Sequence, residues 1–318
     1  ASEPPGWLAR LKPAHWGDFL FQAVTFFFAS LVLVLIVAMF VEMLQNSHLA
    51  LQKFGLAFLY TSTWDPVAGE FGALPFVYGT IVSSALALLI SVPISIAVAL
   101  FVTYQAPMAL RRPVISLVEL LAAIPSVAYG LWGIFVLAPF MRDHAAPVLR
   151  DTLGFLPLFQ GPSFGVGMLT AGLILAIMVT PIVTAVSRDV LAAVPAHQRD
   201  GALALGATPW EASRIVIAYA LPGIVGAVIL GLARAVGETM AVTMVIGNRP
   251  EISASLFAPG YTMASVIANE FTEATEEIYL HALIEIGVLL FIVSFIVRAF
   301  AQLLVWYATR GRTLGREG

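Results

Sequence analysis

The chain has 318 residues, of which 60% are hydrophobic and only 11% are charged, and its mean hydropathy is +0.93. Soluble domains carry roughly 25% charged residues, so this composition excludes an ordinary soluble protein and indicates an integral membrane protein. The net charge of −3 is too small to specify a partner. The absence of cysteine excludes disulfides, thiolate metal sites and cysteine nucleophiles.

Apolar runs predict the membrane spans. Each of six runs is long enough to cross a bilayer as a helix, which takes about 20 residues. The first run is too long for a signal-peptide core, so we expect it to remain as a membrane helix. We expect kinks at Pro93 and Pro125, and a break at Pro222-Gly223 that leaves Ile224–Ile246 as the crossing part of the fifth run. The sequence therefore predicts an all-α, polytopic fold with spans at Phe19–Leu44, Phe76–Tyr104, Val114–Phe140, Phe164–Val186, Ile215–Ile246 and Ala282–Tyr307.

The basic residues predict an orientation in which both termini are cytoplasmic. Ten Lys or Arg residues would lie on one side of the membrane and four on the other, and the richer side faces the cytoplasm. The expected cytoplasmic set is Arg10, Lys12, Arg111, Arg112, Arg188, Arg199, Arg214, Arg310, Arg312 and Arg316, and the expected outer set is Lys53, Arg142, Arg150 and Arg249.

Two opposite charges, Arg234 and Glu238, lie inside the fifth run. A charge near the bilayer centre costs about 2.5–3.5 kcal/mol on insertion scales, so its presence indicates a function. If Ile224–Ile246 crosses the membrane, Arg234 lies at mid-bilayer. The spacing of four residues places the two side chains on one helix face, where they can form an ion pair.

A row of small residues adjoins this face of the expected helix. Ala227, Gly231 and Ala235 allow another helix to approach closely, so we expect the charged pair to face a helix bundle or a subunit interface. The planar guanidinium of Arg234 suits a tetrahedral oxyanion such as phosphate or sulfate, and Glu238 would hold it when the site is empty. The alternative interpretation is a neutralising structural pair.

Three other charges within the runs are weaker candidates. Glu119 lies about two turns into the third run from its expected cytoplasmic end, where snorkelling to the interface or a cap to a neighbouring helix explains it as well as a function does. For Glu285 and Arg298 a structural role is the better interpretation, because Arg298 can extend its head group to the interface.

The cytoplasmic segment Arg188–Arg214 predicts a short helix, a turn at Gly206 and a second helix near the membrane surface. Thr208 is the expected cap of the second helix, with Pro209 at its first position. An ordinary amphipathic connector would give the same pattern.

This segment resembles the coupling loop of the permease subunits of ABC importers, whose hallmark is Glu-Ala-Ala, three residues, Gly, nine residues and Ile-x-Leu-Pro. The chain has Asp200-Gly201-Ala202 followed by Gly206, and it departs from the hallmark at its first two positions and at Ala218-Tyr219. The resemblance implies contact with an ATPase through Asp200, Gly201, Ala202, Leu205, Gly206, Ala207 and Thr208.

Two further motifs are similar to those of phosphate permease subunits of the PstC type. Glu119–Gly133 reads ELLAAIPSVAYGLWG and Gly231–Asn248 reads GLARAVGETMAVTMVIGN. The residues after Gly-Glu-Thr separate this type from the PstA type. The resemblance extends over about residues 76–307 and implies a MetI-like fold, that of type I ABC-importer permeases, in a bacterial inner membrane. The implied phosphate pathway contains Arg234, Glu238, Thr239, Glu119 and Ser126.

The resemblance also implies the partners of the chain. They are a homologous PstA-type permease subunit, a cytoplasmic PstB-type ATPase homodimer, an extracytoplasmic PstS-type phosphate-binding protein, inorganic phosphate and the lipid bilayer, with no nucleic acid. A Walker A motif needs a lysine after glycine, and neither Lys12 nor Lys53 follows one. We therefore expect no ATPase activity and no cofactor on this chain, because ATP and Mg would be bound by the partner.

The expected division is an N-terminal segment at 1–75 with the first membrane helix and an outer loop, a permease core at 76–310 and a cytoplasmic tail at 311–318. The core would hold five membrane helices and the coupling segment 189–213. Two other functional classes stay open: a permease for sulfate or molybdate, and a proton-coupled secondary anion transporter, for which no inverted repeat is apparent. A non-transporting scaffold would leave the charged pair unexplained.

Overall fold

The computed structural model describes residues 16–309, so the expected tail at 311–318 and the first fifteen residues lie outside the described part. Labels beginning with η mark short π-helical or 3₁₀ segments. In chain order the elements are α1 (Trp16–Asn46), α2 (His48–Phe54), α3 (Ala57–Tyr60), β1 (Trp64–Asp65), β2 (Glu70–Phe71), α4 (Leu74–Leu100), η2 (Phe101–Gln105), α5 (Met108–Ala123), α6 (Ser126–Trp132), η3 (Gly133–Leu137), α7 (Ala138–Phe140), η4 (Met141–Ala145), α8 (Ala146–Leu153), η5 (Pro157–Phe159), α9 (Met168–Ala192), α10 (Ala196–Ala204), α11 (Pro209–Val236), α12 (Met240–Val245), α13 (Met263–Glu270) and α14 (Glu277–Thr309).

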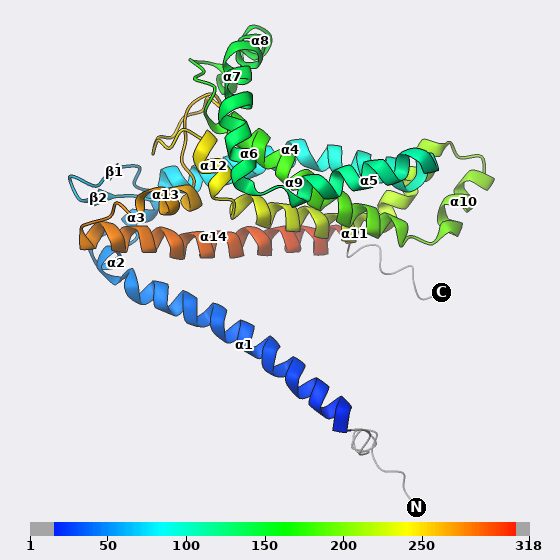
Figure 1. Ribbon diagram of the computed structural model, residues 1–318, viewed down its shortest axis with the longest axis horizontal. Coiled ribbons are helices and arrows are strands. Elements are labelled where there is room, and N and C mark those ends of the chain that lie inside the picture. Colours follow the sequence, from blue (N-terminus) through cyan, green and yellow to red (C-terminus); the bar gives the residue numbers. More distant parts are fainter. Residues whose placement is uncertain (1–15, 310–318) are drawn as a thin grey trace, which may run out of the picture.

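Long apolar helices make up most of the molecule. In the described part, 5 helices are long and apolar enough to span a membrane, and a bent pair of helices brings the number to 6. They correspond to all six expected runs, and the all-α fold is confirmed apart from the short antiparallel hairpin β1-β2. Helices α4, α9, α11 and α14 share one long direction, with α2 and the hairpin at one end and α10 at the other (Figure 1).

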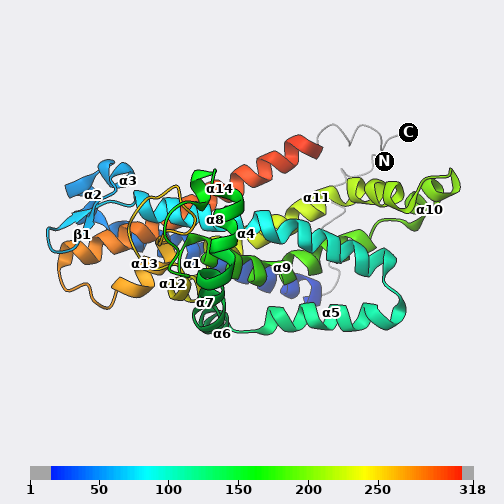
Figure 2. The ribbon, with the colours of Figure 1, turned by 90° about the horizontal axis from the view of Figure 1, so that it is seen from above.

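The third run does not form one straight span. Helix α5 ends at Ala123, and the chain turns by 94° before the segment that begins at Ser126. Pro125 was expected to kink the run, and the structure places it at this break. The phenol of Tyr129 donates a hydrogen bond to the carbonyl of Leu121 at 2.8 Å, which gives a carbonyl at the end of α5 a partner. Helix α5 lies along the bundle, whereas α6 to α8 turn aside from it (Figures 1 and 2).

The fifth run breaks at a different place from the expected one. Helix α11 continues through Pro222 as far as Val236, and the chain leaves the helix at Gly237. The expected break at Pro222-Gly223 and the expected crossing helix Ile224–Ile246 are therefore wrong. A membrane helix tolerates proline where neighbouring helices hold it, and here the side chain of Val190 in α9 packs directly against Gly223.

The centre of the bundle is the packing of α9 between α4 and α11. Small residues allow this approach: Ala227, Gly231 and Ala235 are buried, and a Cβ on Gly231 would lie 2.7 Å from methyl carbons of both Val179 and Val183. The expectation that this row of small residues receives a neighbouring helix is confirmed, and that helix is α9.

The loop between Arg249 and Leu280, which we expect on the outer side, is partly packed against the molecule. Its segment from Leu256 to Val266 is mostly buried, and burial raises the pKa of the Tyr261 phenol, which stays protonated. Glu270 accepts hydrogen bonds from the indole of Trp64 at 2.8 Å and from the phenol of Tyr279 at 2.7 Å. These bonds tie the hairpin, α13 and α14 into one end of the molecule.

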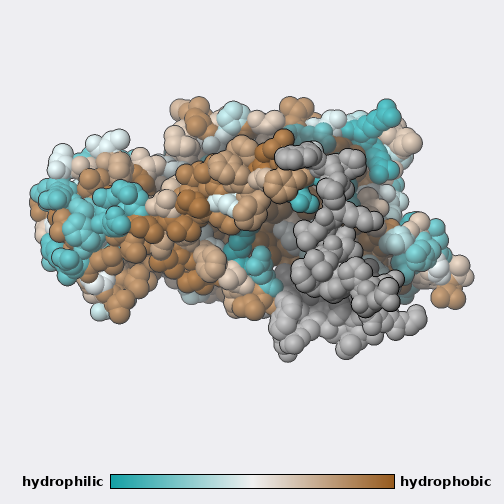
Figure 3. Space-filling model, turned by 90° about the horizontal axis from the view of Figure 1, so that it is seen from below, coloured by the Kyte–Doolittle hydropathy of each residue, from teal (hydrophilic) through white to brown (hydrophobic). Residues whose placement is uncertain are grey.

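Helix α1 follows a separate course. It contacts the rest of the chain near its C-terminal end, where Phe40 packs on Phe291 of α14, and its N-terminal part diverges from the bundle (Figure 1). Apolar surface covers the middle of the molecule, and hydrophilic residues gather toward its ends (Figure 3). This distribution is that of a protein surrounded by lipid.

The packing of α11 on α9 predicts opposite effects of two glycine substitutions. Gly231→Ala places a methyl group against Val179 and Val183 and should destabilise the protein by about 1–3 kcal/mol through overpacking. Gly226→Ala is the matched control, because no described atom lies within 4 Å of its added Cβ, and it should be neutral or stabilising by up to about 1 kcal/mol. Thermal unfolding of the purified variants measures both. Equal stability of the two variants would contradict the helix contact.

Candidate functional site

The charged pair forms, and it lies at a helix end. The Nη2 of Arg234 is 2.9 Å from the Oε2 of Glu238. Arg234 occupies the last turn of α11, where the negative end of the helix dipole favours a cation. Its expected position at the middle of a crossing helix is therefore wrong, because the helix ends two residues later. Glu238 lies in the break between α11 and α12.

The two partners differ in exposure. The carboxylate of Glu238 is 4% exposed, whereas the side chain of Arg234 is 44% exposed. The second carboxylate oxygen, Oε1, accepts the backbone N–H of Ala241 at 3.3 Å in the first turn of α12. Glu238 thus joins the C-terminal end of α11 to the N-terminal end of α12. Its oxygens are occupied, while part of the guanidinium of Arg234 remains open to a ligand.

Thr239 lies in the same break between α11 and α12. It is the N-cap residue of α12, and its carbonyl accepts both the backbone N–H of Thr243 at 2.9 Å and the hydroxyl of that residue at 2.8 Å. The Thr239 side chain is partly exposed, and its hydroxyl makes only a long bond of 3.4 Å to the carbonyl of Gly237.

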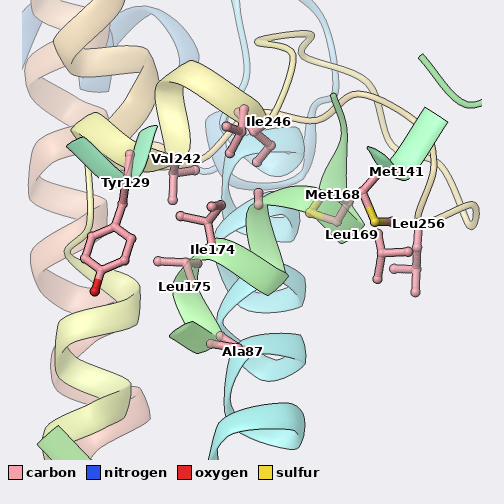
Figure 4. Packing of buried hydrophobic residues seen from close by; sticks show 14 of the residues in the cluster. Ala87, Tyr129, Met141, Met168, Leu169, Ile174, Leu175, Val242, Ile246 and Leu256 are labelled. Carbon is pink, nitrogen blue, oxygen red and sulfur yellow. The ribbon is translucent and has the colours of Figure 1, made fainter. Parts of the chain in front are cut away.

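Ser126 begins the helix that packs beside α12. A Cβ on Gly130 would lie 3.2 Å from the Cα of Ala241, and a Cβ on Gly133 would lie 2.6 Å from Val245. The side chain of Met244 also lies against Gly130, so α6 and the start of η3 pack against α12. Figure 4 shows Tyr129 of α6 and Val242 of α12 in the same core cluster as Ile174 of α9. The helix that begins at Ser126 and the helix that Thr239 caps are therefore neighbours.

Glu119 is engaged elsewhere. Its carboxylate is 3.8 Å from the Nη1 of Arg188 in α9, and its side chain is 64% exposed. Arg188 also pairs with Asp189 at 2.9 Å. The sequence shows Arg188 only as a loop charge, because nothing in it reveals that α5 and α9 lie side by side. The expected alternative for Glu119, a bond to a neighbouring helix, is what the structure contains.

Neither of the remaining charges within the spans, Glu285 and Arg298, forms an ion pair with Arg234. Glu285 is buried, and its Oε2 has no hydrogen-bond partner among the described residues. Arg298 lines a mainly apolar cavity of about 350 Å³ between α1, α11 and α14, together with Phe291 and Phe295.

The segment expected to contact an ATPase is a helix and a sharp turn. Asp200, Gly201 and Ala202 belong to α10, and Gly206 follows it with a φ of +88°, a conformation that favours glycine. Ala202 is buried, and its carbonyl accepts the N–H of Ala207 at 3.0 Å, which closes the turn.

Thr208 then begins the next helix. Its hydroxyl and the carboxylate of Glu211 form a reciprocal capping box, so the expected cap is confirmed. The expected second helix near the membrane surface is not separate, because α11 runs from this cap to Val236 without a break. Leu205 is 91% exposed and Trp210 is 67% exposed, so an apolar surface lies open at this end.

This arrangement places a half-exposed cation at one end of α11 and an exposed apolar turn at the other. The described residues contain no cluster of three or more His, Asp or Glu side chains that could hold a metal ion. A fixed, half-exposed guanidinium has the chemistry to bind an oxyanion, and the continuous helix α11 connects it to the exposed turn at the other end.

Comparisons with known proteins identify relatives along nearly the whole chain. Residues 91–305 match the family described as binding-protein-dependent transport system inner membrane component. The chain is 46% identical to the phosphate transport system permease protein PstC of Mesorhizobium japonicum, over 90% of this chain and 89% of the relative. It is 46% identical to the protein of the same description from Xylella fastidiosa, over 92% of both chains.

A solved structure supports the fold. The inward-facing MetNI methionine ABC transporter aligns with 78% of this chain and 100% of that chain, with a TM-score of 0.51 and 19% identity. This likeness concerns the fold alone, and it confirms the expected MetI-like architecture. The chain belongs to the binding-protein-dependent transport system inner membrane components, a family of multi-pass membrane proteins, and within it to the PstC-type permeases.

Proposed function

We propose that this chain is the permease subunit of an ATP-driven importer of inorganic phosphate. The observation that carries the proposal is the similarity to phosphate permeases over nine-tenths of the chain, 46% identity over 90% of its length. The ion pair of Arg234 and Glu238 supports the proposal independently. A half-exposed guanidinium beside a buried carboxylate can bind an anion reversibly.

Phosphate would contact Arg234 transiently. The guanidinium has donors left after its bond to Glu238, and an oxyanion would take these without displacing the carboxylate. Because Glu238 keeps its own bond to Arg234, the carboxylate repels the anion and prevents tight retention. The hydroxyls of Thr239 and Ser126 would complete the site, and Glu119 with Arg188 would lie along the same pathway away from it.

The partners follow from the proposed role. The pathway would be formed with a homologous PstA-type permease, the energy would come from a cytoplasmic PstB-type ATPase homodimer, and phosphate would arrive from a PstS-type binding protein. Both termini and α10 would then face the cytoplasm. We retain the division into an N-terminal segment at 1–75 and a permease core at 76–310, with the coupling segment at 189–213.

Helix α11 would couple ATP hydrolysis by the partner to phosphate transport. Leu205 and Trp210 form the exposed surface that would enter a groove of the ATPase. The capping box at Thr208 joins this surface to a helix of 28 residues that ends beside Arg234, a length of about 42 Å. A displacement imposed at the turn would therefore reach the charged pair as a movement of one rigid element.

Removal of the guanidinium tests the pathway. Arg234→Ala and Arg234→Lys should each lower phosphate uptake by at least about tenfold, since a charged hydrogen bond contributes about 1.5–3 kcal/mol. The measurement is uptake of radiolabelled phosphate by the reconstituted importer.

A second variant separates transport from folding. Arg234→Ala leaves the buried carboxylate of Glu238 without its counter-charge, which destabilises a protein. The double variant Arg234→Ala, Glu238→Gln removes that charge, so it should be more stable than Arg234→Ala and still fail to transport. Full uptake by any assembled Arg234 variant would exclude Arg234 from the pathway.

The turn at Gly206 gives a test of coupling. Gly206→Ala should strain the turn at its positive φ, whereas Gly206→Asn should be tolerated better, because asparagine adopts this conformation more readily. We expect the alanine variant to hydrolyse less ATP per complex and to import less phosphate than the asparagine variant. Both variants are compared by ATPase rate and uptake after co-purification with the ATPase. Identical coupling in the two variants would contradict a docking role for this turn geometry.

A further inference from the structure

A second cavity, of about 250 Å³, lies where η2 and the C-terminal end of α9 meet α5, α10 and α11. Its lining includes Arg111 of α5, Tyr104 of η2, and Arg199 and Asp200 of α10. None of the residues assigned above to the phosphate pathway lines it. A water molecule occupies about 30 Å³ in the liquid, so the space admits one tetrahedral oxyanion together with waters.

The two arginines at this cavity, Arg111 and Arg199, have no ion-pair partner among the described residues. Two guanidinium groups from different helices therefore line one small space, and the carboxylate of Asp200 in the same lining pairs with neither of them. Planar guanidinium groups bind oxyanions by paired hydrogen bonds, so the missing counter-ion is one that both can contact.

Arg199 carries an unpaired donor. Its Nε is buried and has no hydrogen-bond partner within the described residues. The guanidinium carbon lies 5.3 Å from the ring centre of Tyr104, whose hydroxyl donates to the carbonyl of Leu191 at 2.6 Å. Tyr104 is thus anchored to α9, and it fixes the guanidinium by a cation–π contact. A buried N–H without an acceptor is unfavourable, and an oxyanion in the cavity would supply the acceptor.

We propose that this cavity is a binding site for a phosphate group, separate from Arg234. Arg111 and Arg199 would hold the oxyanion between α5 and α10. The N-terminal end of α10 would contribute as well, because its cap, Pro195, offers no side-chain acceptor to the first N–H groups, and both Pro195 and Ala196 line the cavity. The carboxylate of Asp200 would accept a hydrogen bond from the P–O–H group of hydrogen phosphate, a donor that sulfate lacks at neutral pH.

The occupied site would connect the spans to the coupling segment. A phosphate that bridges Arg111 and Arg199 holds α10 against α5, and α10 precedes the exposed turn that we propose docks on the ATPase. Phosphate on the cytoplasmic side of the membrane, where α10 is proposed to lie, would therefore slow ATP hydrolysis by the importer. This consequence rests on the proposed function, whereas the binding site itself does not.

Equilibrium binding of radiolabelled inorganic phosphate tests the site. The assembled importer is placed in phosphatidylcholine nanodiscs and carries Arg234→Ala throughout, so the proposed transport site does not contribute. The double variant Arg111→Gln, Arg199→Gln should bind phosphate at least about tenfold more weakly, since each charged hydrogen bond contributes to affinity. The matched control is Arg112→Gln, an exposed neighbour outside the cavity, which should bind as the parent does.

Equal binding by the double variant and its parent would overturn the proposal. If the double variant does not assemble, Arg199→Lys replaces it. This variant keeps the charge but lacks the Nε–H, and it should still bind several-fold more weakly. Parental binding by Arg199→Lys would equally count against the site.

Two further arms identify the source of the phosphate group. Nanodiscs of phosphatidylglycerol that abolish the difference between parent and double variant would assign the site to a lipid headgroup, while an unchanged difference would assign it to free phosphate. Sulfate should compete weakly, and competition as strong as that of phosphate would remove Asp200 from the site. ATP hydrolysis is then measured with phosphate added on the side of the ATPase. The added phosphate should slow hydrolysis by the importer that keeps Arg111 and Arg199 more than hydrolysis by the importer with the double variant. Phosphate binding in this cavity can be observed even if the importer does not take up phosphate. A negative result for one proposal therefore does not decide the other.

Discussion

One buried carboxylate holds the centre of this protein together. Glu238 is 4% exposed and lies in a break of the polypeptide, where it bonds to Arg234 behind it and to the N–H of Ala241 ahead of it. An isolated ionised carboxylate is costly to bury, so this position is stable only because a cation and a helix N-terminus meet there. The direction of α12, and with it the packing of α6 and α9, depends on this junction.

The surrounding structure explains why the junction tolerates an open charge. Helices α4, α9 and α11 approach closely through small residues, so the buried face of α11 is complete without Arg234. The guanidinium therefore lies beside the packed face of the helix, where it remains accessible. The same helix begins at a capped turn with exposed apolar side chains. The proposed binding site and the proposed partner contact thus lie at opposite ends of one helix.

Much of this could be predicted from the sequence. Apolar length predicts the spans, the spacing of four residues predicts the pair of Arg234 and Glu238, and Thr208-Pro209 predicts a helix start. The family resemblance adds the architecture. These features are local, because each depends on residues within a few turns of one another or on a continuous motif.

The breaks could not be placed in the same way. Pro125 and Pro222 give the same local signal, yet the chain turns by 94° beside one and continues as a helix through the other. The difference arises from packing: Val190 of α9 covers the helix near Pro222, whereas α5 has no buried residues to hold it straight. The partners of Glu119 and Arg199 likewise depend on helices that are distant in sequence.

The uneven burial of the molecule has a mechanical consequence. Aromatic rings and the buried loop fasten α4, α13 and α14 at the end that carries the hairpin. Trp64 makes edge-to-face contacts with Phe71 and Phe76, and Phe71 stacks on Tyr279. At the opposite end α5 contains no buried residue. Movement of the helices would therefore be largest at the end that carries α5 and smallest at the end that carries the hairpin.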